Sequence, residues 1–289
     1  MFPSKGIGAL LVASVSFGSS AILVRFATEA STVSLTFFRL SIAAFAMILL
    51  ALSSRSLRRL DRHDLMLVAV AGAFLSLHFA TFILAVKETT VANATFLVNT
   101  GPVMLAILSP IVIKERTTSR EVVGVVVATL GVLLIAYAGN GFRTFGLGDI
   151  SAIAAAFLVA VYSLVGRHLR TGGVSTQCYT SYVYAAATLV SLAMTQLLGG
   201  GTFRSYNTVN IVAILGLGIV PTLVGHSLYN YSLGSVKVVT ANLFPLLEPI
   251  IASILAVLLF SEIPTLAQIG GYSLVLVSVA IVVTSLQKG

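Results

Sequence analysis

Polar and aromatic residues recur at one spacing inside otherwise apolar stretches of the chain. Residues three and four apart share one face of an α-helix. Such faces can offer imidazole, hydroxyl and amide groups with aromatic surface to a small ligand, or they can join helices by hydrogen bonds. The three groups, each at positions i, i+3 and i+4, are His78, Thr81 and Phe82; Phe96, Asn99 and Thr100; and His226, Tyr229 and Asn230.

Two charged side chains, Glu248 and Arg39, fall inside apolar stretches. An unpaired ionised group within a membrane costs about 2.5–3.5 kcal/mol on insertion scales. Glu248 can be interpreted as a proton carrier, as a protonated or hydrogen-bonded structural acid, or as a contact for the amine of a ligand. Arg39 is either its counter-ion or a group that orients a carboxylate.

Prolines interrupt two of the apolar stretches. Pro102 and Pro110 lie in one, and Pro245 and Pro249 in the other. Proline lacks an amide donor and clashes with the carbonyl four residues earlier. We therefore expect Pro249 to free the carbonyl of Pro245, and Pro102 that of Val98. Freed carbonyls can accept an ammonium group, although a packing kink satisfied by neighbouring side chains explains the same prolines.

The candidate binding residues combine these groups with polar and aromatic positions of the first and sixth apolar stretches. Proline-interrupted segments at corresponding places in the two halves of a chain are the strongest sequence indicator of a ligand-binding site between the halves. The candidates are Ser16, Phe17, Ser20, His78, Thr81, Phe82, Phe96, Asn99, Pro102, Tyr162, His226, Tyr229, Pro245 and Glu248. No catalytic residue, metal site or cofactor is expected.

The composition excludes several classes of protein. The chain has 289 residues, of which 57% are hydrophobic and 9% charged, whereas soluble domains carry about 25% charged residues. A soluble enzyme, a disordered chain and a nucleic-acid-binding domain are therefore excluded. Cys178 is the single cysteine, so no internal disulfide or cysteine-based metal cluster can form. No phosphate-binding loop is present for an ATP-driven pump.

Ten segments are long and apolar enough to cross a bilayer as helices. About 20 residues are needed for one crossing, and only helices or closed barrels satisfy the backbone in lipid. The predicted spans are residues 6–26, 32–52, 65–86, 90–113, 120–139, 148–166, 176–198, 209–232, 238–260 and 266–286. The lipid bilayer is thus an expected partner, and nucleic acid is not.

The positive charges are unequally distributed between the two sides. Basic residues gather on the cytoplasmic side of membrane proteins, so both termini are expected in the cytoplasm, with the protein in the inner (plasma) membrane. The side of the N-terminus holds Lys5, Arg55, Arg58, Arg59, Arg62, Lys114, Arg116, Arg120, Arg167, Arg170, Lys237 and Lys288. The opposite side holds Arg25, Lys87, Arg143 and Arg204.

The second half of the chain resembles the first. At an offset of 147 residues, three pairs coincide: Pro102 with Pro249, Glu115 with Glu262, and Gly124 with Gly271. Near the start of each half the offset is about 145, which aligns Phe17 with Tyr162 and Arg25 with Arg170. Five spans per half is an odd number, so the second copy enters the membrane inverted. The predicted fold is all-α, with ten transmembrane helices in two inverted five-helix repeats, residues 6–139 and 148–286.

The end of each half resembles an EamA-type repeat. The resemblance rests on Leu247-Glu248-Pro249 through Phe260-Ser261-Glu262, with Gln268 and Gly270-Gly271, and on Thr100-Gly101-Pro102 through Lys114-Glu115-Arg116, with Gly124 and Gly131. It covers essentially the whole chain and implies the drug/metabolite transporter superfamily, including exporters of amino acids such as the aromatic ones. Phe17 departs from the tryptophan of many relatives, so an aromatic substrate is not carried over.

The expected function is therefore transport of small metabolites rather than catalysis. Inverted repeats of this kind bind substrate near the bilayer midplane and alternate access to it. A weakly charged, hydrogen-bonding cavity suits amino acids or similar zwitterionic or amphipathic metabolites, moved by export or by facilitated diffusion. A proton-coupled multidrug or metabolite antiporter is one alternative, and a channel-like pore or an intramembrane enzyme are others. The oligomeric state cannot be predicted.

Overall fold

The computed structural model describes residues 3–89, 91–140, 146–199, 201, 203–260 and 263–286. These residues form helices and no strand, and ten helical segments are long and apolar enough to span a membrane. The segments are Lys5–Phe26, Thr32–Ser53, Arg62–Glu88, Ala94–Val112, Ser119–Ala138, Leu147–Thr171, Thr176–Leu198, Thr208–Ser232, Val238–Leu255 and Leu266–Thr284. The predicted all-α fold and its ten spans are confirmed, and the protein is a multi-pass membrane protein.

Six spans consist of one continuous helix each. Their bounds are α3 (Thr32–Ser53), α4 (Arg62–Glu88), α7 (Ser119–Asn140), α8 (Leu147–Thr171), α9 (Thr176–Leu198) and α14 (Leu266–Leu286). Several begin at a residue whose side chain accepts a hydrogen bond from the third amide that follows it, as helix N-caps do. Ser31 caps α3, Asp61 caps α4 and Ser175 caps α9 in this way. Each of these caps satisfies an amide at the start of the helix that has no partner within the helix.

The other four spans are broken into shorter helices. The first contains α1 (Pro3–Gly18) and α2 (Ser20–Phe26), and the fourth contains α5 (Val91–Val98) and α6 (Gly101–Val112). The eighth contains α10 (Thr208–Leu217), the π-helical segment η1 (Gly218–His226) and α11 (Ser227–Ser232). The ninth contains α12 (Val238–Leu243), the 3₁₀ segment η2 (Phe244–Leu247) and α13 (Glu248–Phe260).

Pro102 and Pro245 lie at these breaks, whereas Pro110 lies inside α6. The predicted consequence for the backbone is wrong at Pro249 and stays a prediction at Pro102. The carbonyl of Pro245 is not free, because the amide of Glu248 donates to it across the 3₁₀ turn. In the 3₁₀ turn the hydrogen bond joins residues three apart instead of four. The amide of Glu248 therefore takes the place of the donor that Pro249 lacks. Asn99 and Thr100 form a turn between α5 and α6. Thr100 therefore does not continue the helical face of Phe96, as the spacing predicted.

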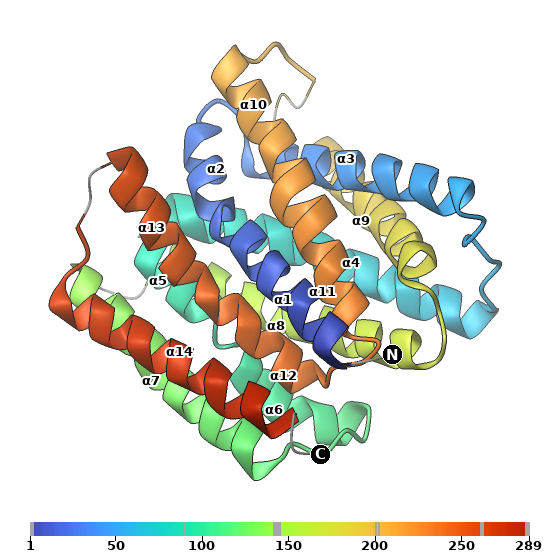
Figure 1. Cartoon of the computed structure of the whole chain (residues 1–289). Helices are drawn as coiled ribbons and strands as arrows, with labels where there is room; N and C mark the ends of the chain where they lie inside the picture. Colours follow the sequence, from blue (N-terminus) through green and yellow to red (C-terminus); the bar gives the residue numbers. More distant parts are fainter. Residues whose placement is uncertain are drawn as a thin grey trace.

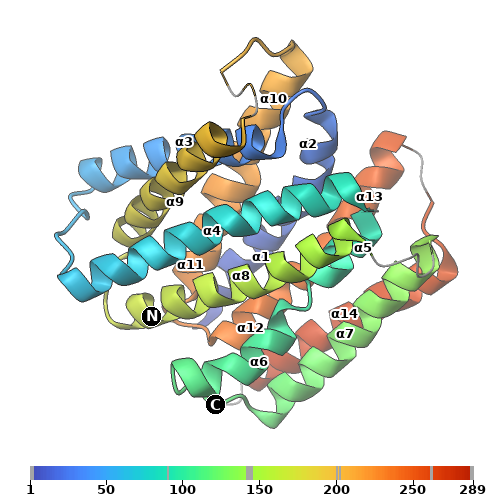
Figure 2. The same cartoon turned by 180° about the vertical axis from the view of Figure 1, so that it is seen from behind.

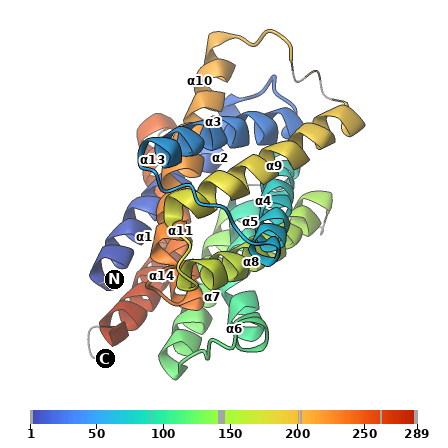
Figure 3. The ribbon, with the colours of Figure 1, turned by 90° about the vertical axis from the view of Figure 1, so that its right-hand side faces the viewer.

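The helices pack mainly in pairs that join the two halves of the chain. Figures 1 and 2 show α7 and α14 running side by side along one edge of the molecule, and Figure 3 shows α3 beside α9. Glycines allow the close approach of α7 and α14: a Cβ on Gly131 would lie 2.8 Å from the carbonyl oxygen of Gly271. Because lipid does not drive helices together, such small residues are what permits tight contact.

The pattern of contacts is preserved when each span is exchanged for the one five places later. The second span packs on the seventh, and the fifth on the tenth. The third span packs on the sixth as the eighth packs on the first, and the fourth packs on the sixth as the ninth packs on the first. This exchange fits two related five-span units. Of the residues used in the sequence argument, Arg143, Ser261, Glu262 and Lys288 lie outside the described residues.

Glu115, the acid of the first repeat motif, links the two halves. Its Oε1 lies 2.8 Å from Nη2 of Arg167, and its Oε2 accepts a hydrogen bond of 2.8 Å from the amide of Val238. Arg167 also donates through Nη1 to the carbonyl of Leu233 at 2.6 Å. The motif acid therefore ties the connection between α6 and α7 to α8 and to the start of α12.

Candidate functional site

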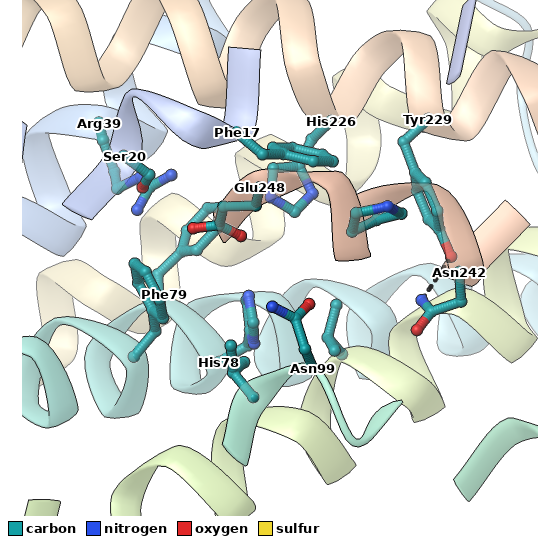
Figure 4. A pocket seen from close by; sticks show the side chains of 14 residues that line it. Phe17, Ser20, Arg39, His78, Phe79, Asn99, His226, Tyr229, Asn242 and Glu248 are labelled. Atoms are coloured by element: carbon teal, nitrogen blue, oxygen red, sulfur yellow. Dashed lines mark hydrogen bonds between the residues drawn. The ribbon is translucent and has the colours of Figure 1, made fainter. Parts of the chain in front are cut away.

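A cavity lies between the broken spans and the third, with a free space of about 620 Å³ that includes its opening to the exterior. The first, second, third, fourth, sixth, eighth and ninth spans all contribute side chains to it. Its lining residues are Phe17, Ser20, Arg39, His78, Phe79, Phe82, Val98, Asn99, Val159, His226, Tyr229, Asn242, Pro245 and Glu248. Figure 4 shows Glu248 in the middle of this group, with Arg39 on one side and His226 on the other.

Arg39 is held by two contacts and keeps part of its guanidinium unused. Its Nε donates to the hydroxyl of Thr222 at 2.9 Å, and its Cζ lies 3.6 Å from the centre of the Phe79 ring. A guanidinium over an aromatic face is stabilised by the ring quadrupole. Arg39 is 1% exposed, yet its Nη1 has no hydrogen-bond partner among the described residues. The cavity thus contains a fixed cation with a free donor.

Glu248 offers the complementary free acceptor. It is the first residue of α13, it is 7% exposed, and its Oε1 has no hydrogen-bond partner in the part of the chain that the structure describes. No ion pair within 4.0 Å joins it to Arg39 in the described part of the chain. The direct counter-ion arrangement, one of the two predicted roles of Arg39, is therefore not formed here. A buried polar atom without a hydrogen-bond partner is costly, so Nη1 of Arg39 and Oε1 of Glu248 are suited to a partner that is not part of the protein.

The two histidines lie in one aromatic cluster. The ring of His226 is 4.9 Å from the rings of Phe17 and Phe79, and 6.3 Å from that of His78. Nδ1 of His78 lies 2.8 Å from the carbonyl oxygen of Ala155. Since a carbonyl only accepts, Nδ1 carries the proton in this contact. Nδ1 of His226 is buried, and no described residue forms a hydrogen bond with it.

Amide and hydroxyl groups complete the cavity wall. Asn242 donates from Nδ2 to the hydroxyl of Tyr229 at 3.0 Å, and Tyr229 donates to the hydroxyl of Ser163 at 2.9 Å. Nδ2 of Asn99 is buried and has no hydrogen-bond partner within the described ranges of the chain. In Figure 4, Asn99 and His78 point toward the space below the Glu248 carboxylate. The cavity therefore has unused donors beside an unused acid, which is the composition of a binding site rather than of a packed core.

The structure brings nine of the fourteen candidate residues to the cavity and places five elsewhere. Ser16 donates to the carbonyl of Val12, and Thr81 donates to the carbonyls of Leu77 and His78. Both hydroxyls thus bond to their own helices. Three further candidates are not among the lining residues: Phe96 packs on the core, Pro102 opens α6, and Tyr162 is fully buried beside Asn230.

Five lining residues were not among the candidates. Arg39 stands out in the sequence as a charge within a span, but its spacing does not assign it to the site. Asn242 is not assigned to the site either, because a single asparagine within a span is equally typical of a hydrogen bond between helices. Phe79 precedes Phe82 by three residues and follows His78 directly, so a search along both neighbouring faces of α4 finds it. Val98 and Val159 are ordinary apolar residues, and nothing in the sequence distinguishes them from lipid-facing valines.

The family model of the EamA-like transporter family matches the chain twice, over residues 4–137 and 146–284. The chain therefore belongs to this family, and it is a membrane transporter. An uncharacterized transporter of Archaeoglobus fulgidus is 30% identical over 280 residues, which are 96% of this chain and 95% of the relative. The uncharacterized transporter YdfC of Bacillus subtilis is 28% identical over 82% of this chain and 77% of its own length.

One further relative has a more specific name. It is the probable terminal-alkyne amino-acid exporter of Streptantibioticus cattleyicolor, which is 26% identical over 93% of this chain and 90% of its own length. Among solved structures, one crystal structure matches all of this chain and 99% of its own with a TM-score of 0.81 at 18% identity. That likeness shows a shared fold. The relatives have the names of transporters and not of enzymes.

Proposed function

We propose that the protein transports amino acids or closely related zwitterionic metabolites, with its substrate bound between Arg39 and Glu248. One observation carries this proposal: a buried guanidinium and a buried carboxylate share one cavity, and each has an atom without a partner. A zwitterion has the complementary pair of groups. Its carboxylate would accept from Nη1 of Arg39, and its ammonium would donate to Oε1 of Glu248.

The energetic argument favours a zwitterion over a singly charged solute. Leaving a buried charge unpaired costs several kcal/mol, and pairing it recovers much of this cost. A zwitterion satisfies both charges at once and adds no net charge to the apolar interior. A cation or an anion satisfies one group and leaves the other unpaired. The rings of Phe17, Phe79, Phe82 and His226 would receive the side chain of the substrate.

The name of the Streptantibioticus cattleyicolor relative supports an amino-acid substrate and the direction of export. In the proposed mechanism, residues 6–139 and 148–286 form two inverted units whose relative movement opens the cavity to one side and then to the other. Export and facilitated diffusion share this movement. We place the protein in the inner (plasma) membrane with both termini in the cytoplasm, since the basic residues gather on that side.

Uptake by purified protein in liposomes tests this proposal. A panel of labelled amino acids is compared with their N-acetyl and methyl-ester derivatives, which keep only the carboxylate or only the ammonium. The proposal expects saturable uptake of at least one free amino acid and uptake at least tenfold slower for both of its derivatives. Equal uptake of all three forms would refute it, and uptake that does not saturate would favour a pore.

A second candidate function, proton-coupled antiport of a metabolite or drug, rests on Glu248 itself. An acidic residue buried in a transport cavity can carry a proton across as the substrate moves the other way. The same liposomes distinguish the two functions when a pH gradient is imposed. Antiport predicts accumulation of the substrate against its own gradient, whereas facilitated diffusion predicts that uptake stops at equal concentrations on the two sides.

A further inference from the structure

The hydroxyl of Thr222 lies outside the lining of the binding cavity and forms a hydrogen bond with Arg39, which is part of that lining. Thr222 lies in the π-helical segment η1, is fully buried and is not a lining residue. It donates to the carbonyl of Leu217 at 2.6 Å, five residues earlier. Its single proton is thereby used, so its oxygen can only accept from Nε of Arg39, which lies 2.9 Å away. The contact therefore has one possible direction.

The packing of α3 on η1 sets the register of this contact. Arg39 and Ile42 lie three residues apart on α3, and Thr222 and Gly218 lie four residues apart on η1. A Cβ on Gly218 would lie 2.8 Å from Cβ of Ile42. The glycine thus allows η1 to lie close to α3. About one helical turn away from Gly218, the same close packing places the Thr222 hydroxyl within hydrogen-bond distance of Arg39.

Two groups together fix the guanidinium. Thr222 holds Nε from one side, and the ring of Phe79 lies 3.6 Å from Cζ. With Nε occupied and the plane set by the ring, Nη1 is left as the free donor. Without the acceptor, the guanidinium could rotate to bond elsewhere, and its free edge would no longer have a fixed orientation.

We propose that Thr222 is a positioning residue for Arg39 and that it determines how strongly the cavity prefers a carboxylate over a neutral group. This rests on the proposed function, since the carboxylate is that of the transported zwitterion. Thr222 does not touch the substrate in this account. It acts through the orientation of Arg39, so its loss should change selectivity more than the capacity to transport.

Competition in proteoliposomes tests this role. For an amino acid that the wild-type protein transports, the inhibition constants of that amino acid and of its α-carboxamide are compared in three proteins: wild type, Thr222→Val and Thr222→Ser. A hydrogen bond to a charged group changes an equilibrium by about tenfold or more. We expect Thr222→Val to reduce the preference for carboxylate over carboxamide by about tenfold, and Thr222→Ser to restore it because serine keeps the acceptor.

Controls separate the possible failures. If wild-type protein transports no amino acid, the proposed function fails. If it does, and Thr222→Val keeps the wild-type preference, the positioning role is refuted while the proposed function stands. Should Thr222→Val not fold, Gly218→Ala provides the second test, because the added methyl group moves η1 away from Ile42. An unchanged preference in folded Gly218→Ala protein would also refute the role.

Discussion

Arg39 and Glu248 line the same buried cavity without forming an ion pair with each other. They come from the second and the ninth span, and thus from different halves of the chain. A ligand that binds both Arg39 and Glu248 therefore bridges the two halves of the chain. In a transporter whose halves move against each other, a substrate held in this way would be released when the halves separate around it.

Replacing Glu248 by glutamine tests the role of its charge. The ammonium of a zwitterion needs the ionised carboxylate, so wild-type transport should fall as the pH decreases and Glu248 takes up a proton. Glu248→Gln has no proton to gain and should transport at least tenfold less, with a pH profile flatter than that of the wild type. Initial rates in proteoliposomes measure this. Glu88→Gln, a change at an exposed acid, is the matched control and should keep the wild-type profile.

The contact between Arg39 and Phe79 gives a second prediction. Leucine at position 79 keeps an apolar side chain but removes the aromatic face from the guanidinium. A desolvated cation–π contact contributes about 2 kcal/mol, so the KM of Phe79→Leu should rise about tenfold or more. Phe45 is 68% exposed on the lipid-facing side of α3, and Phe45→Leu should leave the KM unchanged. Equal KM values for both variants would contradict the proposed hold on Arg39.

The packing of α7 on α14 gives a prediction about stability. A Cβ on Gly271 would lie 2.6 Å from the carbonyl oxygen of Gly131, whereas a Cβ on the adjacent Gly270 would meet nothing closer than 3.6 Å. Gly271→Ala should therefore destabilise the protein by about 1–3 kcal/mol, as overpacking does. Gly270→Ala should be neutral. Thermal unfolding in one detergent compares them, and a lower Tm for Gly270→Ala than for Gly271→Ala would show that the helices do not meet in this way.

The proposed orientation can be measured with cysteine labels. The natural Cys178 is fully buried, so a membrane-impermeant maleimide should label only cysteines introduced at exposed positions. Arg59→Cys, between α3 and α4, should react only from the cytoplasmic side. Ser205→Cys, between α9 and α10, should react only from the outside. Labelling of both positions from the same side would refute the topology of two inverted units.

The fold was predictable because each span needs about 20 mostly apolar residues in a helix, and such segments can be recognised in the sequence. The breaks were only partly predictable. Pro102 and Pro245 marked two of them, but the π-helical segment of the eighth span, which contains Pro221 and Thr222, was not predicted. The same holds for the site. His78, His226 and Glu248 stand out as polar residues in apolar surroundings, whereas Thr81 has the same spacing and bonds to its own helix.

The most direct measurement of the central claim is binding of one transported amino acid to purified wild-type, Arg39→Met and Glu248→Gln protein, together with its N-acetyl and methyl-ester derivatives. The account predicts that wild type prefers the free amino acid. It also predicts that Arg39→Met loses affinity for the free amino acid but little for the methyl ester, and that Glu248→Gln loses affinity for the free amino acid but little for the N-acetyl form. If both variants bound the free amino acid as tightly as wild type, the substrate would not lie between these two residues.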